Sequence, residues 1–126
     1  MIKKIYTSKA PEAIGPYSQA IQYNELLFTS GQIPVNPAVG EIVSGGITEQ
    51  AEQVMKNLSA ILTEAGTDFA SVIKTTCYLS DMDNFAAFNA VYGQYFTGKP
   101  ARSCTAVKTL PKNVLCEVEV IAVVEK

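Results

Sequence analysis

Hydrophobic and polar residues follow two different periods along the chain. Between residues 48 and 65, apolar side chains recur at the spacing of one helix face. These positions are Ala51, Val54, Met55, Leu58, Ile61, Leu62 and Ala65. The spacing predicts a helix over residues 48–65, with Thr48 capping its first turn and Gly66 ending it. Clustered aromatic residues predict a second helix over residues 83–96, ended by Gly98 and Pro100.

The remaining segments alternate or are rich in β-branched residues, which is typical of strands. "IYT" is expected to form an edge strand, and "QAIQYN" with "LLFTSGQI" a hairpin. "SVIKTTCYL" is expected to form the next strand. "ARSCTAVKTL" and "CEVEVIAVVE" are expected to form two final strands, joined as a hairpin by "PKNV", and "PVNPAVGEIVSGG" a loop. The order β-β-β-α-β-α-β-β predicts an α+β sandwich with two helices on one face of a mixed sheet, in a single domain over residues 1–126.

The last strand presents two different faces, because successive side chains point to opposite sides of a sheet. One row is wholly apolar and suits burial under the helices: Cys116, Val118, Val120, Ala122 and Val124. The other row begins with Glu117 and Glu119 and ends with Ile121 and Val123. Water alone does not favour the apolar half of that row. We therefore expect another subunit to cover it, in a homo-oligomer with carboxylates near the seam.

Composition narrows the possible functions. Of the 126 residues, 48% are hydrophobic and 17% are charged, which is typical of a globular protein, and the net charge of −2 favours neither nucleic acid nor anionic membrane as a partner. The absence of a signal-like or membrane-spanning apolar run predicts a cytoplasmic protein whose three cysteines are reduced. The chain has no histidine, which excludes Ser-His and Cys-His nucleophilic machinery and predicts no metal site.

Arg102 is the residue that most needs an explanation, because it opens a strand otherwise suited to burial. An arginine at a strand end can extend to water along its aliphatic stem, or it can form two charge-assisted hydrogen bonds to a carboxylate. Cys104 shares its sheet face, and a small buried residue is the better interpretation than a nucleophile. Of Glu117 and Glu119, spacing alone allows either to act as a general base.

Several blocks of sequence occur together in a recognisable order: "AIGPYSQAI", "FTSGQIPVNP", "FNAVYGQYF", "PARSC" and "LPKNVLCEVEVIAV". In these blocks the chain resembles the reactive intermediate deaminase (Rid, or YjgF) family over nearly its whole length. The resemblance implies a chorismate-mutase-like, ferredoxin-like-related fold and a homotrimer with active sites between subunits. It also implies hydrolysis of reactive enamines and imines, such as 2-aminoacrylate and 2-aminocrotonate, to 2-oxo acids and ammonia without a cofactor. A 2-iminobutanoate/2-iminopropanoate deaminase is the activity expected.

The resemblance assigns roles to particular residues. Arg102 would anchor the substrate carboxylate and Glu117 would position the attacking water. Cys104 would line the pocket. Three residues of the "GPYSQ" and "TSGQ" turns, Tyr17, Ser30 and Gly31, would bind substrate. Asn89 on the second helix would also reach the pocket, although a helix-end or interface role is almost as plausible.

The expected hairpin adds a distance argument. It would place Glu117 near Val107, about five residues along the strand from Arg102, or on the order of 16 Å. That distance is too long for one small substrate. We therefore expect Arg102 of one chain to meet Glu117 of its neighbour, and a folded monomer to be inactive.

Two other function classes remain open. The first is a binding module whose clefts hold 2-oxo acids or similar carboxylates and report them to a partner. The second is an RNA-cleaving or translation-inhibiting protein, which fits poorly with an acidic chain that lacks histidine and any strip of basic and aromatic residues.

Overall fold

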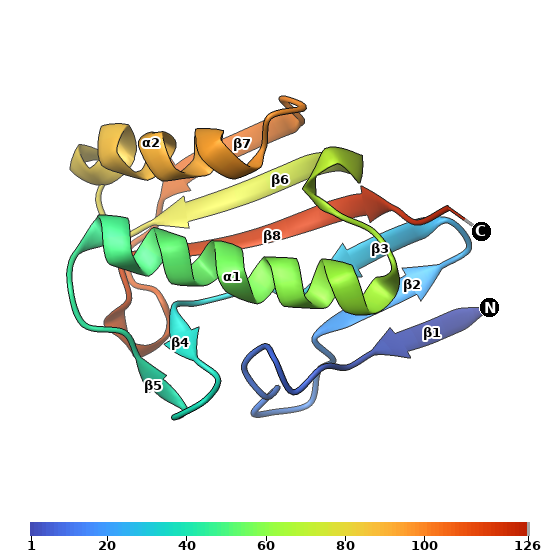
Figure 1. Cartoon of the computed structure of the whole chain (residues 1–126). Helices are drawn as coiled ribbons and strands as arrows, with labels where there is room; N and C mark the ends of the chain where they lie inside the picture. The colour runs from blue at the N-terminus through green and yellow to red at the C-terminus, as the bar shows by residue number, and fades with distance from the viewer. Residues whose placement is uncertain (126) are drawn as a thin grey trace.

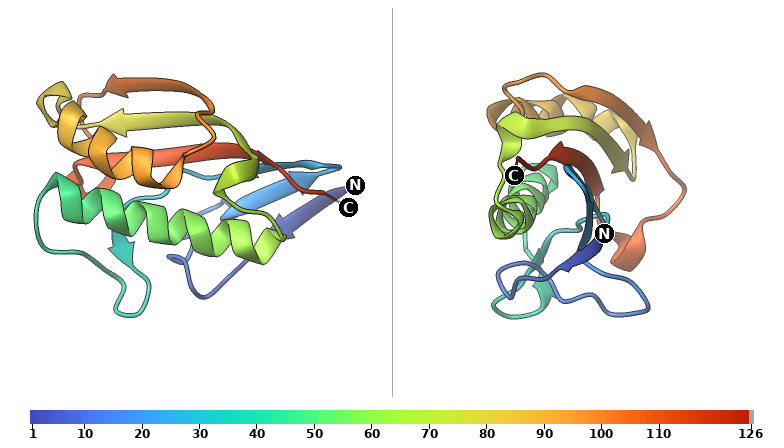
Figure 2. Two further views of the ribbon diagram at one scale, coloured as in Figure 1. Left: turned by 45° about the horizontal axis from the view of Figure 1, so that its top comes forward. Right: turned by 90° about the vertical axis from the view of Figure 1, so that its right-hand side faces the viewer.

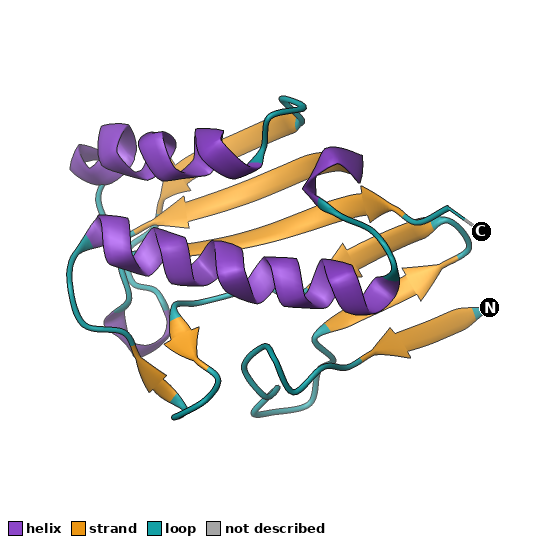
Figure 3. Ribbon diagram, in the orientation of Figure 1, coloured by secondary structure: helices purple, strands orange, loops and turns teal. Residues whose placement is uncertain are grey.

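Two helices lie across the same face of a six-stranded sheet in the computed structural model, which describes residues 1–125 (Figures 1 and 3). The strands run in the spatial order β1-β2-β3-β8-β6-β7. Their bounds are β1 Ile2–Ile5, β2 Ala20–Tyr23, β3 Leu26–Thr29, β6 Val72–Leu79, β7 Ala101–Ala106 and β8 Cys116–Val123. A separate two-stranded sheet, β4 Val35–Asn36 with β5 Glu41–Ile42, occupies the segment that was predicted to be a loop. The α+β class and the order of the main elements are confirmed.

Both helices occur close to their predicted positions, as α1 Ile47–Ala65 and α2 Phe85–Tyr95. The predicted cap by Thr48 is wrong, because the helix begins one residue earlier, after Gly46. There the Glu49 carboxylate accepts the Gly46 N–H at 2.8 Å, which satisfies one of the free backbone donors of the first turn. Gly66 ends α1 as predicted, in the left-handed conformation (φ 84°) that glycine adopts without steric cost.

The predicted hairpin between the last two strands is wrong. β6 lies between them and pairs in parallel with β7 and antiparallel with β8. After α2 returns the chain to the sheet edge as β7, residues 107–115 carry it around β6 to the central position of β8 (Figure 1). The physical reason is burial: alternate residues of β8 are apolar and fully covered, whereas β7 exposes Ser103 and Thr105 and suits an edge.

The predicted division of β8 into two faces is confirmed. Cys116, Val118 and Val120 are buried beneath the helices, which lie on one side of the sheet (Figure 2). Glu117 and Glu119 point to the other side, which we call the open face.

Apolar side chains continue across the open face on neighbouring strands. The pairing Ile2–Tyr23–Leu26–Val123 runs from β1 to β8, and Phe28 lies opposite Ile121. Ile2, Tyr23, Leu26 and Phe28 are exposed in the single chain. A contiguous exposed apolar surface of this kind is typical of an interaction surface. This agrees with the prediction that a second subunit covers it, which stays a prediction.

Polar contacts fix the loop after β3. Asn57 of α1 is fully buried and donates from Nδ2 to the carbonyls of Ile33 and Val35, both at 3.0 Å. The backbones of Gln32 and Val118 exchange hydrogen bonds of 2.8 and 3.2 Å. Because buried polar groups that lose a partner are costly, these bonds hold the loop at a fixed place beside β8.

Candidate functional site

The residues predicted to form one site fall into two groups. Arg102, Asn89 and Cys104 lie on β7 and α2, and we call them the guanidinium cluster. Tyr17, Ser30, Gly31 and Glu117 lie around the end of β3 and the start of β8, and we call the hollow that they line the carboxylate cleft. Each group is assembled within one chain, but the two groups are not brought together.

The sheet register separates the two groups. Arg102 is paired with Thr75, and Thr75 with Val120, so Arg102 projects toward the helix side. Glu117 projects toward the open face, two strands away and three residues along the sheet, which corresponds to roughly 10 Å in each direction. The neighbour of Glu117 is Tyr78, not Val107 as the hairpin would require. A single chain therefore cannot apply Arg102 and Glu117 to the same small molecule.

The guanidinium of Arg102 lies over the aromatic surface of α2. Its Nη1 donates to Asn89 Oδ1 at 2.6 Å, and its carbon lies 4.6 Å from the centre of the Tyr92 ring and 5.4 Å from that of Phe85. All three of these partners are uncharged side chains. Since a guanidinium has five N–H donors, most remain available for a planar anion.

The surroundings of the guanidinium are also suited to an anion. Arg102 and Lys99 both line a hollow of about 520 Å³ with Asn89 and Tyr92. The described residues that line it include no aspartate or glutamate. Two cations without an opposing carboxylate favour a negatively charged ligand.

Cys104 lies beside the buried Cys77 of the neighbouring strand. Burial raises the pKa of the Cys104 thiol, and the nearby Arg102 charge only partly opposes this effect. A protonated thiol is a poor nucleophile. The surroundings therefore favour Cys104 as part of the pocket wall over Cys104 as a nucleophile.

The carboxylate cleft has a volume of about 370 Å³ on the open face. Ser30 Oγ donates to the Ser18 carbonyl at 2.6 Å, so its proton points away while its lone pairs can still accept a hydrogen bond. Tyr17 is exposed at the rim. Gly31 leaves room for Glu117, because a Cβ atom at Gly31 would lie 1.9 Å from Glu117 Oε2.

The structure distinguishes two acids that spacing could not. Glu119 Oε1 accepts a hydrogen bond from the Tyr78 hydroxyl at 3.0 Å, whereas Glu117 is half-buried beside Gly31. Burial raises the pKa of Glu117, and the negative charge of Glu119 raises it further. Glu117 is thus the better candidate for proton transfer. Sequence reasoning missed Tyr78, whose position opposite Glu117 depends on the strand pairing.

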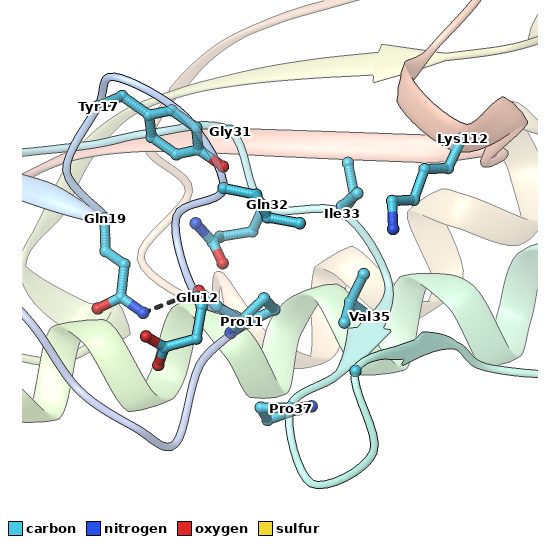
Figure 4. A pocket seen from close by; sticks show the side chains of 12 residues that line it. Pro11, Glu12, Tyr17, Gln19, Gly31, Gln32, Ile33, Val35, Pro37 and Lys112 are labelled. Atoms are coloured by element: carbon cyan, nitrogen blue, oxygen red, sulfur yellow. Dashed lines mark hydrogen bonds between the residues drawn. The ribbon is translucent and has the colours of Figure 1, made fainter.

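A second cavity, of about 160 Å³, adjoins the carboxylate cleft. Tyr17, Gly31 and Ile33 line both spaces. Figure 4 shows Tyr17 and Pro37 at opposite ends of this second cavity, with the Gln32 side chain between them. Its walls are mostly apolar, so the surroundings of the cleft can accommodate aliphatic groups as well as polar ones.

Residues 1–125 show neither a membrane-spanning helix nor a metal-binding cluster. No helix there is long and apolar enough to cross a membrane. Within the same residues, no group of three or more acidic or cysteine side chains is arranged to hold a metal ion.

Comparisons with known proteins agree over almost the whole length. Residues 7–124 match the family described as Endoribonuclease L-PSP. The chain is 57% identical to the Lactococcus lactis protein AldR, whose name describes it as a regulator, over 98% of this chain and 99% of that one. It is 48% identical to the Mus musculus 2-iminobutanoate/2-iminopropanoate deaminase, over 96% and 90%. The structure of Escherichia coli TdcF with bound serine superposes with a TM-score of 0.92 at 43% identity, over 98% and 99%.

Gly31→Ala is expected to destabilise the protein by about 1–3 kcal/mol, because the added methyl group overlaps the Glu117 carboxylate and forces it to move. Gly93→Ala in α2 is a matched control: its added methyl meets no atom within 4 Å, and alanine favours a helix by about 0.5–1 kcal/mol. Denaturant unfolding measures both changes. An unchanged stability together with an unmoved Glu117 in a crystal structure of Gly31→Ala would contradict the prediction.

Glu119→Gln is expected to lower the pKa of Glu117, because it removes one of the two causes that raise it. In the wild-type protein, the raised pKa means that the folded state holds the Glu117 proton more tightly than the unfolded state does. The contribution of Glu117 to stability is therefore present below its pKa in the unfolded state and is lost as pH rises through its pKa in the folded state. Glu119→Gln brings these two pKa values closer together, so the loss occurs over a narrower range of pH. Carbon-13 NMR titration of the Glu117 carboxyl measures the shift, with Glu41→Gln on β5 as the control. Equal Glu117 pKa values in both variants would count against the prediction.

Proposed function

Because the chain belongs to the Endoribonuclease L-PSP family, also called the YjgF/Rid family, we propose that it hydrolyses 2-imino acids and their enamine tautomers to 2-oxo acids and ammonia. The observation that carries this proposal is the two-pronged guanidinium of Arg102, which we call the fork. The Asn89 amide and two aromatic rings hold it in place, and most of its N–H donors stay free. The deaminase name of the mouse relative supports the same reaction.

The reaction needs an anchor for the carboxylate and a base for water. Arg102 binds the carboxylate of the imino acid through two parallel N–H donors. Glu117 takes a proton from a water molecule as the water oxygen bonds to the C=N carbon, and it passes that proton to the nitrogen as the C=N double bond becomes single. In the resulting carbinolamine the hydroxyl proton moves to the nitrogen as the C–N bond breaks, which releases ammonia and leaves a C=O group. A carboxylate whose pKa is raised is a better base for this step than an ordinary one.

The proposed active site lies between subunits of a homotrimer, with Arg102 from one chain and Glu117 from the next. Two observations support this arrangement. The two side chains project from opposite faces of one sheet, and the open face that carries Glu117 also exposes apolar side chains. A second copy of the chain that covers the open face would bury these side chains and close the carboxylate cleft.

A carboxylate-binding regulator is the second candidate, and the regulator name of the Lactococcus relative favours it. The TdcF structure with bound serine shows that a similar protein binds a small molecule with a carboxylate. Both candidates use the same arginine fork. They differ in whether product forms faster when the ligand is an imine.

Arg102→Ala is expected to lower kcat/KM for 2-aminoacrylate about 100-fold or more, because it removes a charge-assisted pair to the substrate carboxylate. A dehydratase supplies 2-aminoacrylate from serine, and the rate of 2-oxo acid formation is measured. Lys108→Ala, a solvent-exposed control, is expected to leave the rate unchanged. Equal rates for wild type and Arg102→Ala would reject the proposed reaction. Saturable carboxylate binding without faster product formation would favour the regulator.

Mixing inactive variants tests the shared site. Co-refolded Arg102→Ala and Glu117→Ala chains in equal amounts are expected to recover about a quarter of wild-type activity, because three-quarters of random trimers are mixed and each has one intact site of three. Each variant refolded alone is the control. Absence of recovery in verified mixed trimers, or full activity in a verified monomer, would contradict the shared site.

A further inference from the structure

Arg102 is fixed by a closed chain of contacts that runs through the protein core. Thr75 of β6 is the register partner of Arg102 on β7, so the two side chains rise from the sheet next to each other. Tyr92 of α2 contacts both side chains from the helix layer. Its hydroxyl bonds to Thr75 Oγ1 at 2.7 Å, and its ring lies 4.6 Å from the guanidinium carbon.

The Tyr92 ring is itself packed against two other aromatic rings of the same segment. It stacks on Phe96 with ring centres 4.3 Å apart and lies 5.9 Å from Phe88. Thr75, its hydrogen-bond partner, is completely buried. Burial also raises the pKa of Tyr92, and either hydroxyl of the Thr75–Tyr92 pair can be the donor. The plane on which the guanidinium rests is therefore defined by the core.

The two hydroxyls are not needed for packing. The other core residues on the same side of β6 are Val72, Cys77 and Leu79, and valine would fit the strand at position 75 equally well. Phenylalanine would fill the space of the Tyr92 ring. Replacing both partners of a buried hydrogen bond by apolar groups is close to neutral for stability, so the pair adds direction rather than folding energy.

We propose that Thr75 and Tyr92 are positioning residues that orient the Arg102 guanidinium for the substrate carboxylate. This inference rests on the proposed function, in which Arg102 binds that carboxylate. Asn89 holds Nη1 from one side, while the Tyr92 ring, 4.6 Å from the guanidinium carbon, limits how the guanidinium can turn. The Thr75 hydroxyl fixes that ring at its far end. A fork in a fixed plane binds a planar carboxylate with less loss of side-chain freedom.

The test compares substitutions at position 75 that separate the hydroxyl from the packing. Thr75→Val keeps the shape and removes the hydroxyl, whereas Thr75→Ser keeps the hydroxyl and removes a methyl group. Calorimetric titration with 2-oxobutanoate as the probe gives Kd, and steady-state imine hydrolysis gives KM and kcat. We expect Thr75→Val to raise Kd and KM about tenfold with kcat within about twofold, and Thr75→Ser to remain near wild type.

Tyr92→Phe and the double variant Tyr92→Phe/Thr75→Val complete the design. The double variant leaves no buried hydroxyl without a partner, so it is expected to fold with near wild-type stability and still bind 2-oxobutanoate about tenfold more weakly. This variant keeps the test decisive if Thr75→Val alone folds poorly.

Three results would overturn the inference. The first is a wild-type Kd in the double variant while Arg102→Ala loses binding. The second is an equal loss of binding in Thr75→Ser and Thr75→Val, which would indicate packing alone. The third is an unchanged Kd in Arg102→Ala, which would leave no fork to position. If no protein in the series accelerates imine hydrolysis, the proposed reaction fails, and the Kd comparison still decides the role of Thr75 and Tyr92.

Discussion

The candidate site depends on a guanidinium that is held in place without a carboxylate to neutralise its charge. Arg102 has an amide on one edge and aromatic rings beneath it, and these contacts fix its place while leaving its charge unmatched by any partner within residues 1–125. Cation–π contacts stabilise a guanidinium without using all of its hydrogen-bond donors. An internal carboxylate would have stabilised the same charge but occupied the fork. The arrangement thus leaves most N–H donors of the guanidinium available for the proposed anionic ligand.

The two-residue period of the strands determines the rest of the functional geometry. Arg102 lies on the helix side of the sheet, and Glu117 lies on the open face, so the folded chain carries the two halves of the proposed site on opposite faces. The apolar surface beside Glu117 indicates how the halves can be joined, because burying it favours association. The exposed apolar surface and the half-buried Glu117 therefore lie on the same face of the sheet.

Burial gives different properties to chemically identical residues. Glu117 and Glu119 are two positions apart on one strand, but Glu119 is engaged by Tyr78 and Glu117 is pressed against the backbone at Gly31. The same principle applies to Cys104, because burial raises the pKa of its thiol despite the neighbouring arginine. Residue type therefore identifies the candidates for acid–base and nucleophilic roles, and the surroundings of each residue distinguish between them.

Sequence periodicity by itself determined the two helices, the hairpin of β2 and β3, and the buried face of β8, because burial repeats with the geometry of each element. Residue chemistry raised Arg102, Glu117 and Glu119 as candidates, and the family resemblance selected Arg102 and Glu117 among them. Only the tertiary structure decided the neighbours of β7 and β8, since strand pairing over a long connection leaves no local pattern, and a short turn such as "PKNV" fits either arrangement. The contacts of Arg102 with Tyr92, of Tyr92 with Thr75, and of Glu119 with Tyr78 all follow from that pairing. They arise between residues far apart in the chain, where only the packing of the whole fold sets the distance.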